Sequence, residues 1–188
     1  ATLDGPESVF ITQDKLFIAD SRNKRVLIYN SIPTSNGAAA DIVLGQTDFV
    51  SKVSGTSATT FKNPTDVWSD GTRVFVSDAG NHRILIWNAF PTVNGQAADV
   101  VIGQPDFTSG SHGLAADKFR RQWNFTVSEI SNQLLVTDLD NHRVLVFNTI
   151  PTVNGASADA VLGQEDFTSR VTGCSEKAIN WPCGVAIL

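Results

Sequence analysis

The segment SDAGNHRILIWN at residues 77–88 decides the fold, because the chain contains three versions of it. ADSRNKRVLIYN stands at residues 19–30 and TDLDNHRVLVFN at residues 137–148, which gives spacings of 58 and 60 residues. The text after each copy repeats in the same phase and ends in GQTDF, GQPDF or GQEDF. A fixed period of this length is typical of repeat proteins. The chain is therefore expected to be a single domain, 1–188, with repeats at about 3–60, 61–120 and 121–178 and the start of a fourth at 179–188.

The polar side chains of this segment are of the types found in active sites. Catalysis needs one constellation in one place, however, so a signature present in every unit favours a structural role. We expect the Asp to close a strand, the Asn to tolerate a left-handed turn, and the Arg to open the next strand and pair with a carboxylate. The first unit has Lys24 where the others have His, so the His is assigned to the same role. These motif residues are Asp20, Asn23, Arg25, Asp78, Asn81, His82, Arg83, Asp138, Asn141, His142 and Arg143.

Each unit is predicted to contain four short strands, at 66–69, 73–77, 84–88 and 99–102 in the second unit. Turn signals such as Asp70-Gly71 and Asn94-Gly95 separate them. The runs VLIY, ILIW and VLVF are apolar on both strand faces, which indicates sheets covered on both sides. Radial stacking of four-stranded sheets makes a β-propeller. The predicted fold is thus all-β, with three four-stranded blades and the first strand of a fourth at 181–188.

The GQxDF segments, at 45–49, 103–107 and 163–167, follow each predicted outer strand. The Gly would supply the backbone angles for leaving the strand, the Asp would cap the turn, and the Phe would fill space between blades. A ligand-binding loop on each blade is the alternative.

The pattern Asp-x-x-Asn-His-Arg-[Ile/Val] is complete at 78–84 and 138–144, and Lys24 replaces its His at 20–26. Pro-x-x-Val precedes it at 6–9 and 64–67 and recurs at 182–185. Over essentially its whole length the chain resembles the NHL-repeat β-propellers, and its PTxNGxxAD and GQxDF segments resemble the bacterial extracellular group. Members of that family include RNA-binding regulators, a peptide-amidating lyase and sensor domains. No counterpart of the lyase's metal-binding His set, or of the RNA binders' basic face, is found.

The net charge of −5 disfavours general binding to nucleic acid or to anionic membranes, and no apolar run is long enough for membrane insertion. Met is absent, even at position 1, which is expected of a chain processed after export or of a fragment. We therefore expect a secreted or cell-surface protein.

Residues that break the repeat are better candidates for function. Residues 109–123 hold His112, which is expected to be exposed. They also hold a basic cluster of Lys118, Arg120 and Arg121, which lies beside Trp123 and could bind an anionic partner. A solvated loop is the alternative for this cluster. Asn124-Phe125-Thr126 is the one sequon, which makes Asn124 a candidate for glycosylation.

Cys174 and Cys183 stand where the second unit has Thr56 and Thr65. Their local spacing predicts a disulfide, which would stabilise the fold by about 2.7 kcal/mol on chain-entropy arithmetic. Two free, buried thiols are the alternative.

The expected strand count does not fit a closed propeller, so both end faces would expose apolar residues. We expect Val9, Phe17, Ile18 and Leu27 near the first open face, and Leu145, Val146, Val185 and Ile187 near the last. Head-to-tail contacts between such faces give a ring or a filament. Further blades of a longer chain would cover the two end faces equally well.

The predicted function is a non-enzymatic extracellular structural or binding module, without cofactor or metal. Its partners would be copies of itself or further blades, with carbohydrate or protein as a possible ligand class. A propeller hydrolase or lyase with a metal at the channel mouth is one alternative, and a sensor or adhesion domain of a larger surface protein is another.

Overall fold

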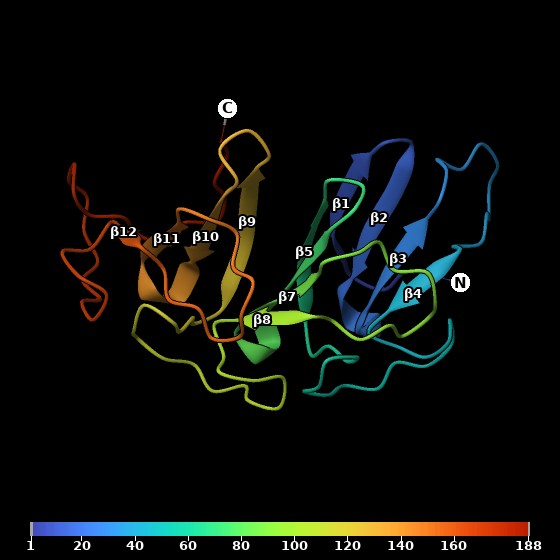
Figure 1. Cartoon of the computed structure of the whole chain (residues 1–188), viewed down its shortest axis with the longest axis horizontal. Coiled ribbons are helices and arrows are strands. Elements are labelled where there is room, and N and C mark those ends of the chain that lie inside the picture. Colours follow the sequence, from blue (N-terminus) through green and yellow to red (C-terminus); the bar gives the residue numbers. More distant parts are fainter. Residues whose placement is uncertain (1, 188) are drawn as a thin grey trace.

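A computed structural model describes residues 2–187, and these form three four-stranded antiparallel sheets (Figure 1). The first sheet contains β1 (Pro6–Thr12), β2 (Lys15–Asp20), β3 (Arg25–Tyr29) and β4 (Ile42–Leu44). The second contains β5 (Pro64–Ser69), β6 (Val74–Asp78), β7 (Arg83–Trp87) and β8 (Val100–Ile102). The third contains β9 (Gln122–Ser128), β10 (Gln133–Asp138), β11 (Arg143–Phe147) and β12 (Ala160–Leu162). Strands that follow one another in the chain are neighbours in each sheet.

The sheets follow one another across the molecule, with the second between the other two (Figure 1). The first strands of neighbouring sheets are in contact, β1 with β5 and β5 with β9. These three strands therefore form the inner side of the array. Helical structure in residues 2–187 is limited to three 3-10 turns of three residues each, so the described part has no helix that could cross a membrane.

The 3-10 turns join the second and third strands, and they are η1 (Ser21–Asn23), η2 (Ala79–Asn81) and η3 (Leu139–Asn141). The sequence pattern predicts left-handed backbone at the Asn of each turn, which is wrong. The residue that follows takes this conformation instead: Lys24, His82 and His142 have φ of 57°, 55° and 54°. The Asn stays in the turn because its side-chain amide is bonded to the Asp that closes the preceding strand.

The second sheet is buried on both faces, as the doubly apolar strands predict. Val76 and Leu85 pack in a cluster with the first sheet, whereas Phe75 and Ile86 pack in a cluster with the third. Aromatic rings also cross the seams between the sheets. Trp68 lies 6.1 Å from Phe10 and 5.4 Å from Phe75 between ring centroids, and Phe75 lies 6.2 Å from Phe125. The core is therefore continuous through all three sheets.

The outer face of the first sheet differs from the prediction. Val9 is 59% exposed there, and Ile18 and Leu27 lie on the same face beneath Phe49 and other partly buried residues of their own repeat. Phe17 is fully buried in the cluster with the second sheet, so its place on the open face is wrong. Successive residues of a strand point to opposite faces, and Phe17 and Ile18 cannot share one.

The outer face of the third sheet needs a similar correction. Leu145 is buried against the second sheet, whereas Val146, Val185 and Ile187 are only partly buried. Leu162 is 49% exposed on β12.

The predicted first strand of a fourth sheet is not formed in residues 181–187, and Leu188 lies outside the described residues. The segment nevertheless lies against the third sheet. The backbone N–H of Trp181 donates to Nδ1 of His142 at 3.3 Å, and that of Val185 donates to Oδ1 of Asn124 at 3.4 Å. A strand needs a paired neighbour, and the described chain provides none beyond this segment.

Candidate functional site

The repeated Asp and Arg side chains form a buried network in each sheet. In the second sheet, Nε of Arg83 donates to Oδ2 of Asp78 at 3.0 Å. Its Nη1 donates to the carbonyl of Phe107 at 2.7 Å, and its Nη2 donates to the carbonyls of Ser57 and Thr60 at 3.0 and 2.9 Å. One guanidinium thus holds the loop that enters the sheet and the loop that leaves it.

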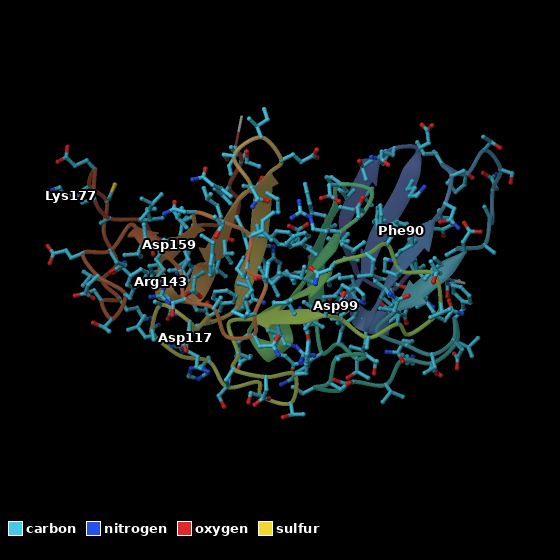
Figure 2. All side chains as sticks on the ribbon, viewed as in Figure 1. Phe90, Asp99, Asp117, Arg143, Asp159 and Lys177 are labelled. Carbon is cyan, nitrogen blue, oxygen red and sulfur yellow. The ribbon has the colours of Figure 1, made fainter. Side chains whose placement is uncertain are left out.

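The other two sheets repeat the arrangement. Nε of Arg25 lies 2.7 Å from Asp20, and Nε of Arg143 lies 2.7 Å from Asp138. Arg143 is labelled within the third sheet in Figure 2. Burial raises the pKa of Asp138, while Arg143 acts in the opposite direction. These groups are sealed from solvent, so they offer a substrate no access.

Asp78 also fixes the chain that leads into the second sheet. Its Oδ1 accepts the backbone N–H groups of Lys62 and Asn63 at 2.9 and 3.0 Å. Asn81 donates from Nδ2 to Oδ2 of Asp78 and to the carbonyl of Gly55, both at 2.8 Å. The Asp and Asn of the repeated motif therefore fix the chain segment that precedes the second sheet.

His82 and His142 connect consecutive repeats. Nδ1 of His82 accepts the backbone N–H of Arg121 at 3.0 Å, and Nδ1 of His142 accepts that of Trp181 in the same way. Burial lowers the pKa of both imidazoles, and the neighbouring His112 lowers that of His82 further. Both are therefore expected to be neutral acceptors near pH 7.

The GQxDF loops are closed by their own side chains. Nε2 of Gln46 donates to the carbonyls of Lys24 and Val53, both at 2.9 Å, and its Oε1 accepts the N–H of Val53. Gln164 repeats all three contacts and Gln104 repeats the two donations. The sequence reasoning gave this Gln no role, because its partners are backbone atoms. Its presence in every repeat was the available signal.

The Asp of each GQxDF loop caps the turn as predicted. Oδ1 of Asp106 accepts the N–H groups of Thr108 and Ser109, both at 2.8 Å, and Asp48 and Asp166 accept the corresponding groups. The hydroxyl of Thr108, together with these backbone groups, lowers the pKa of Asp106, and the corresponding hydrogen bonds lower the pKa of Asp48 and Asp166. The loops therefore use their polar groups internally, which favours scaffold over ligand loop.

The structure brings Arg121 of the predicted basic cluster against Trp123. The guanidinium of Arg121 lies 5.5 Å from the ring centroid of Trp123, and it forms a long 4.0 Å ion pair with Asp140. The backbone carbonyl of Lys118 binds Arg143, and the backbone N–H of Arg120 binds Asp138. Hence Arg121 and Trp123 come together, while Asp140 offsets part of the positive charge. His112 is exposed, and its ring lies 5.6 Å from that of His82.

Asn124 does not present its amide to solvent. Its Nδ2, the atom that a glycan would modify, donates to Oδ2 of Asp66 at 2.9 Å. The residue lies within β9 and is only partly exposed. This geometry argues against the predicted glycosylation.

The contact between Asn124 and Asp66 belongs to a set that the sequence reasoning missed. Ser8 donates from Oγ to Oδ1 of Asp66 at 2.7 Å, so one carboxylate joins the first strands of all three sheets. The backbone N–H groups of Val67 and Phe125 also donate to it. Burial raises the pKa of Asp66, and the hydrogen bonds from Ser8 and these two amides partly offset this. The available signal was that one strand position carries a different polar residue in each repeat, Ser, Asp or Asn, while the residues around it recur.

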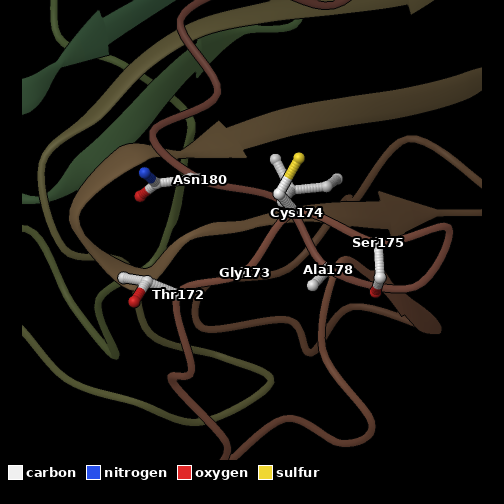
Figure 3. A pocket seen from close by; sticks show the side chains of 7 residues that line it. Thr172, Gly173, Cys174, Ser175, Ala178 and Asn180 are labelled. Atoms are coloured by element: carbon white, nitrogen blue, oxygen red, sulfur yellow. The ribbon is translucent and has the colours of Figure 1, made fainter.

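The predicted disulfide is not present in the structure. Cys174 and Cys183 are both free and exposed, and the thiol of Cys183 donates to the carbonyl of Trp181 at 3.4 Å. Cys174 instead lines an open hollow on residues 172–180 (Figure 3). In residues 2–187, no three His, Cys, Asp or Glu side chains are grouped so that they could hold a metal ion.

No family model matches the sequence, and no curated protein matches it. Among solved structures, the fold is similar to that of a candidate 6-phosphogluconolactonase from Bacteroides fragilis, with a TM-score of 0.50 and 12% identity. The match covers 90% of this chain and 46% of that protein, so the chain spans less than half of that protein's length. At this identity the similarity concerns the fold alone, and it shows a propeller-like all-β arrangement.

Proposed function

We propose that the chain is a structural and binding β-propeller module of the NHL-like type, whose two end faces pair with further sheets of the same kind. These sheets belong to copies of the chain or to the rest of a longer propeller. A secreted or cell-surface location, and a carbohydrate or protein ligand, belong to the same proposal. A sensor or adhesion domain of a larger surface protein is the alternative within the non-enzymatic class.

The observation that supports this proposal is a difference in exposure at equivalent positions. Val67 on β5 is 1% exposed because the first sheet covers it, whereas its counterpart Val9 on β1 is 59% exposed. Ile102 on β8 is fully buried, whereas its counterpart Leu162 on β12 is 49% exposed. The same positions that form the inner seams are therefore open at both ends.

The test is sedimentation velocity of the chain over a wide range of dilution. We expect assemblies larger than the 20.2 kDa chain, and we expect Val9→Asp and Leu162→Asp to dissociate them. Val93→Asp is the matched control, because Val93 is also 59% exposed but lies outside the sheets. A monomer at every dilution that binds no hydrophobic dye would contradict the proposal.

An enzyme is the second candidate, and the Ser8, Asp66 and Asn124 set favours it. It is an unrepeated polar group on β1, β5 and β9, the strands that would line the channel of a complete propeller. The similar Bacteroides fragilis protein is described as a candidate 6-phosphogluconolactonase, and the substrate in that name is 6-phosphogluconolactone. Hydrolysis of that lactone above its spontaneous rate, lost in Asp66→Asn with the circular dichroism unchanged, would support this candidate. Repeating the assay with added divalent cations tests the metal-dependent form, and no acceleration in either assay would oppose the candidate.

A further inference from the structure

The seams after the second and third sheets are held by imidazole acceptors. His82 accepts the backbone N–H of Arg121, which directly precedes β9. His142 accepts that of Trp181, the corresponding residue one repeat later. Arg121 and Trp181 both have left-handed backbone, with φ of 55° and 50°. This conformation is unfavourable for residues other than Gly, so it depends on contacts such as these.

The seam between the first and second sheets lacks this device. Lys24 occupies the position of the His, and an ammonium group has no lone pair to accept a hydrogen bond. The corresponding N–H, that of Asn63, donates instead to Oδ1 of Asp78 at 3.0 Å. The contact between the first and second sheets therefore serves as an internal control, because it has no imidazole acceptor.

We propose that the seams after the second and third sheets are proton-sensitive, because protonation of His82 and His142 removes the acceptors for Arg121 and Trp181. A protonated imidazole carries hydrogen on both nitrogens, so Nδ1 would face the backbone N–H as a second donor. The hydrogen bond is lost and the contact becomes repulsive. The entry to β9 and the segment at 181–187 then loosen, while the first seam keeps its contacts.

The charged groups around each imidazole influence the pH at which it is protonated. His112 and Lys62 oppose protonation of His82, whereas Asp140 and Asp78 favour it. Arg170 and Arg120 oppose protonation of His142, whereas Asp140 favours it. Burial is the largest effect for both, and it lowers their pKa below the ordinary 6.5. Because the folded state favours the neutral imidazole, its contribution to stability is complete above pH 6.5 and is lost as pH falls through the lowered pKa.

The consequence differs between the two seams. β9 is also paired with β10, so loss of the Arg121 contact is local. The segment 181–187 has no strand partner, and its described hydrogen bonds to the third sheet are those of Trp181 and Val185. Acid should therefore loosen the backbone of this segment more than that of β9, while the Trp181 ring, stacked on His142 with centroids 6.5 Å apart, keeps its contact with the third sheet. The inference concerns contacts within one chain, so it stands whether or not the end faces bind other sheets.

The test is a nitrogen-15 NMR titration of the whole chain from pH 7.5 to 5.0. We expect the amide of Arg121 to shift with the same midpoint as the imidazole of His82, and that of Trp181 to shift with His142. The amide of Asn63 should not follow either midpoint. Amides of Arg121 and Trp181 that ignore the imidazole midpoints would overturn the proposal.

Variants separate the imidazole from other titrating groups. His82→Lys copies the first repeat, and we expect the amide of Arg121 to show its acid position already at pH 7.5 and to lose its titration. His112→Ala, the control, should keep the titration, because His112 is not the acceptor. If His82→Lys does not fold, the wild-type titration with Asn63 as internal reference still decides. A titration of Arg121 that persists in folded His82→Lys would refute the role of His82.

Discussion

Nε of Arg83 lies 3.0 Å from the carboxylate of Asp78, and neither side chain is exposed to solvent. The same pair recurs in the first and third sheets at 2.7 Å. Each Arg also binds backbone carbonyls from the loops on either side of its sheet. The pairs therefore set the positions of the loops.

Arg83→Ala should destabilise the chain strongly, because it leaves Asp78 as a buried charge without its partner. Removing one partner of a buried pair costs about 3–5 kcal/mol, which corresponds to a fall in Tm of roughly 10 °C for a chain of this size. Thermal unfolding followed by circular dichroism measures it.

Arg25→Ala is the matched comparison and should cost less. Nη2 of Arg25 binds one carbonyl, that of Thr2, where Nη2 of Arg83 binds two. A fully stable Arg83→Ala variant that had lost a specific activity would contradict the structural role.

Gly103→Ala should also be destabilising, because Gly103 has φ of +83° and a Cβ there would clash with the ring of Phe119. The left-handed backbone costs about 1–3 kcal/mol for any residue other than Gly, and the clash with Phe119 adds to this. Gly37→Ala is the control, since Gly37 has φ of +73° but nothing within 4 Å of a Cβ. Urea unfolding of both variants should show the larger loss for Gly103. Equal losses would mean that Phe119 moves aside freely.

Acid should weaken the GQxDF loops through Asp48, Asp106 and Asp166. Their pKa values are lowered in the folded chain, so their stabilising effect is present above the ordinary 3.8 and is lost as pH falls through the lowered values. Asp106→Asn should thus lower the Tm near pH 6 but make little difference well below pH 3.8. A Tm difference that is the same at both pH values would show that charge at Asp106 is irrelevant.

Both cysteines should react in the folded protein, because both are free and exposed. We expect intact-mass analysis after iodoacetamide treatment without reductant to show two added groups, with one added group in Cys174→Ser. An unmodified wild-type mass that gains two groups only after reduction would restore the disulfide hypothesis.

Three features could be predicted from the sequence because each occurs three times in it: the repeats, the strands, and the Asp and Arg pairs. The face occupied by Phe17 was missed because a shift of one residue along a strand reverses the side. The left-handed position was placed on Asn rather than on His, since general preferences favour Asn and only the fold shows that its amide is engaged elsewhere.

The contacts between sheets were beyond sequence reasoning for another reason. Ser8 and Asp66 are 58 residues apart, and Asp66 and Asn124 are a further 58 apart. Their residue types differ, so nothing in the repeat marks them as partners. The disulfide was expected from proximity in sequence, but Cys174 and Cys183 lie on different features of the folded chain, a hollow and the segment against the third sheet.

Each buried Arg depends on a residue that is synthesised after it. Arg83 binds the carbonyl of Phe107, which is 24 residues further along, and the same distance separates Arg25 from Phe49 and Arg143 from Phe167. A ribosome must therefore deliver two dozen more residues before each buried guanidinium is fully bonded. The buried network of each repeat is therefore completed by a residue that follows the fourth strand of that repeat.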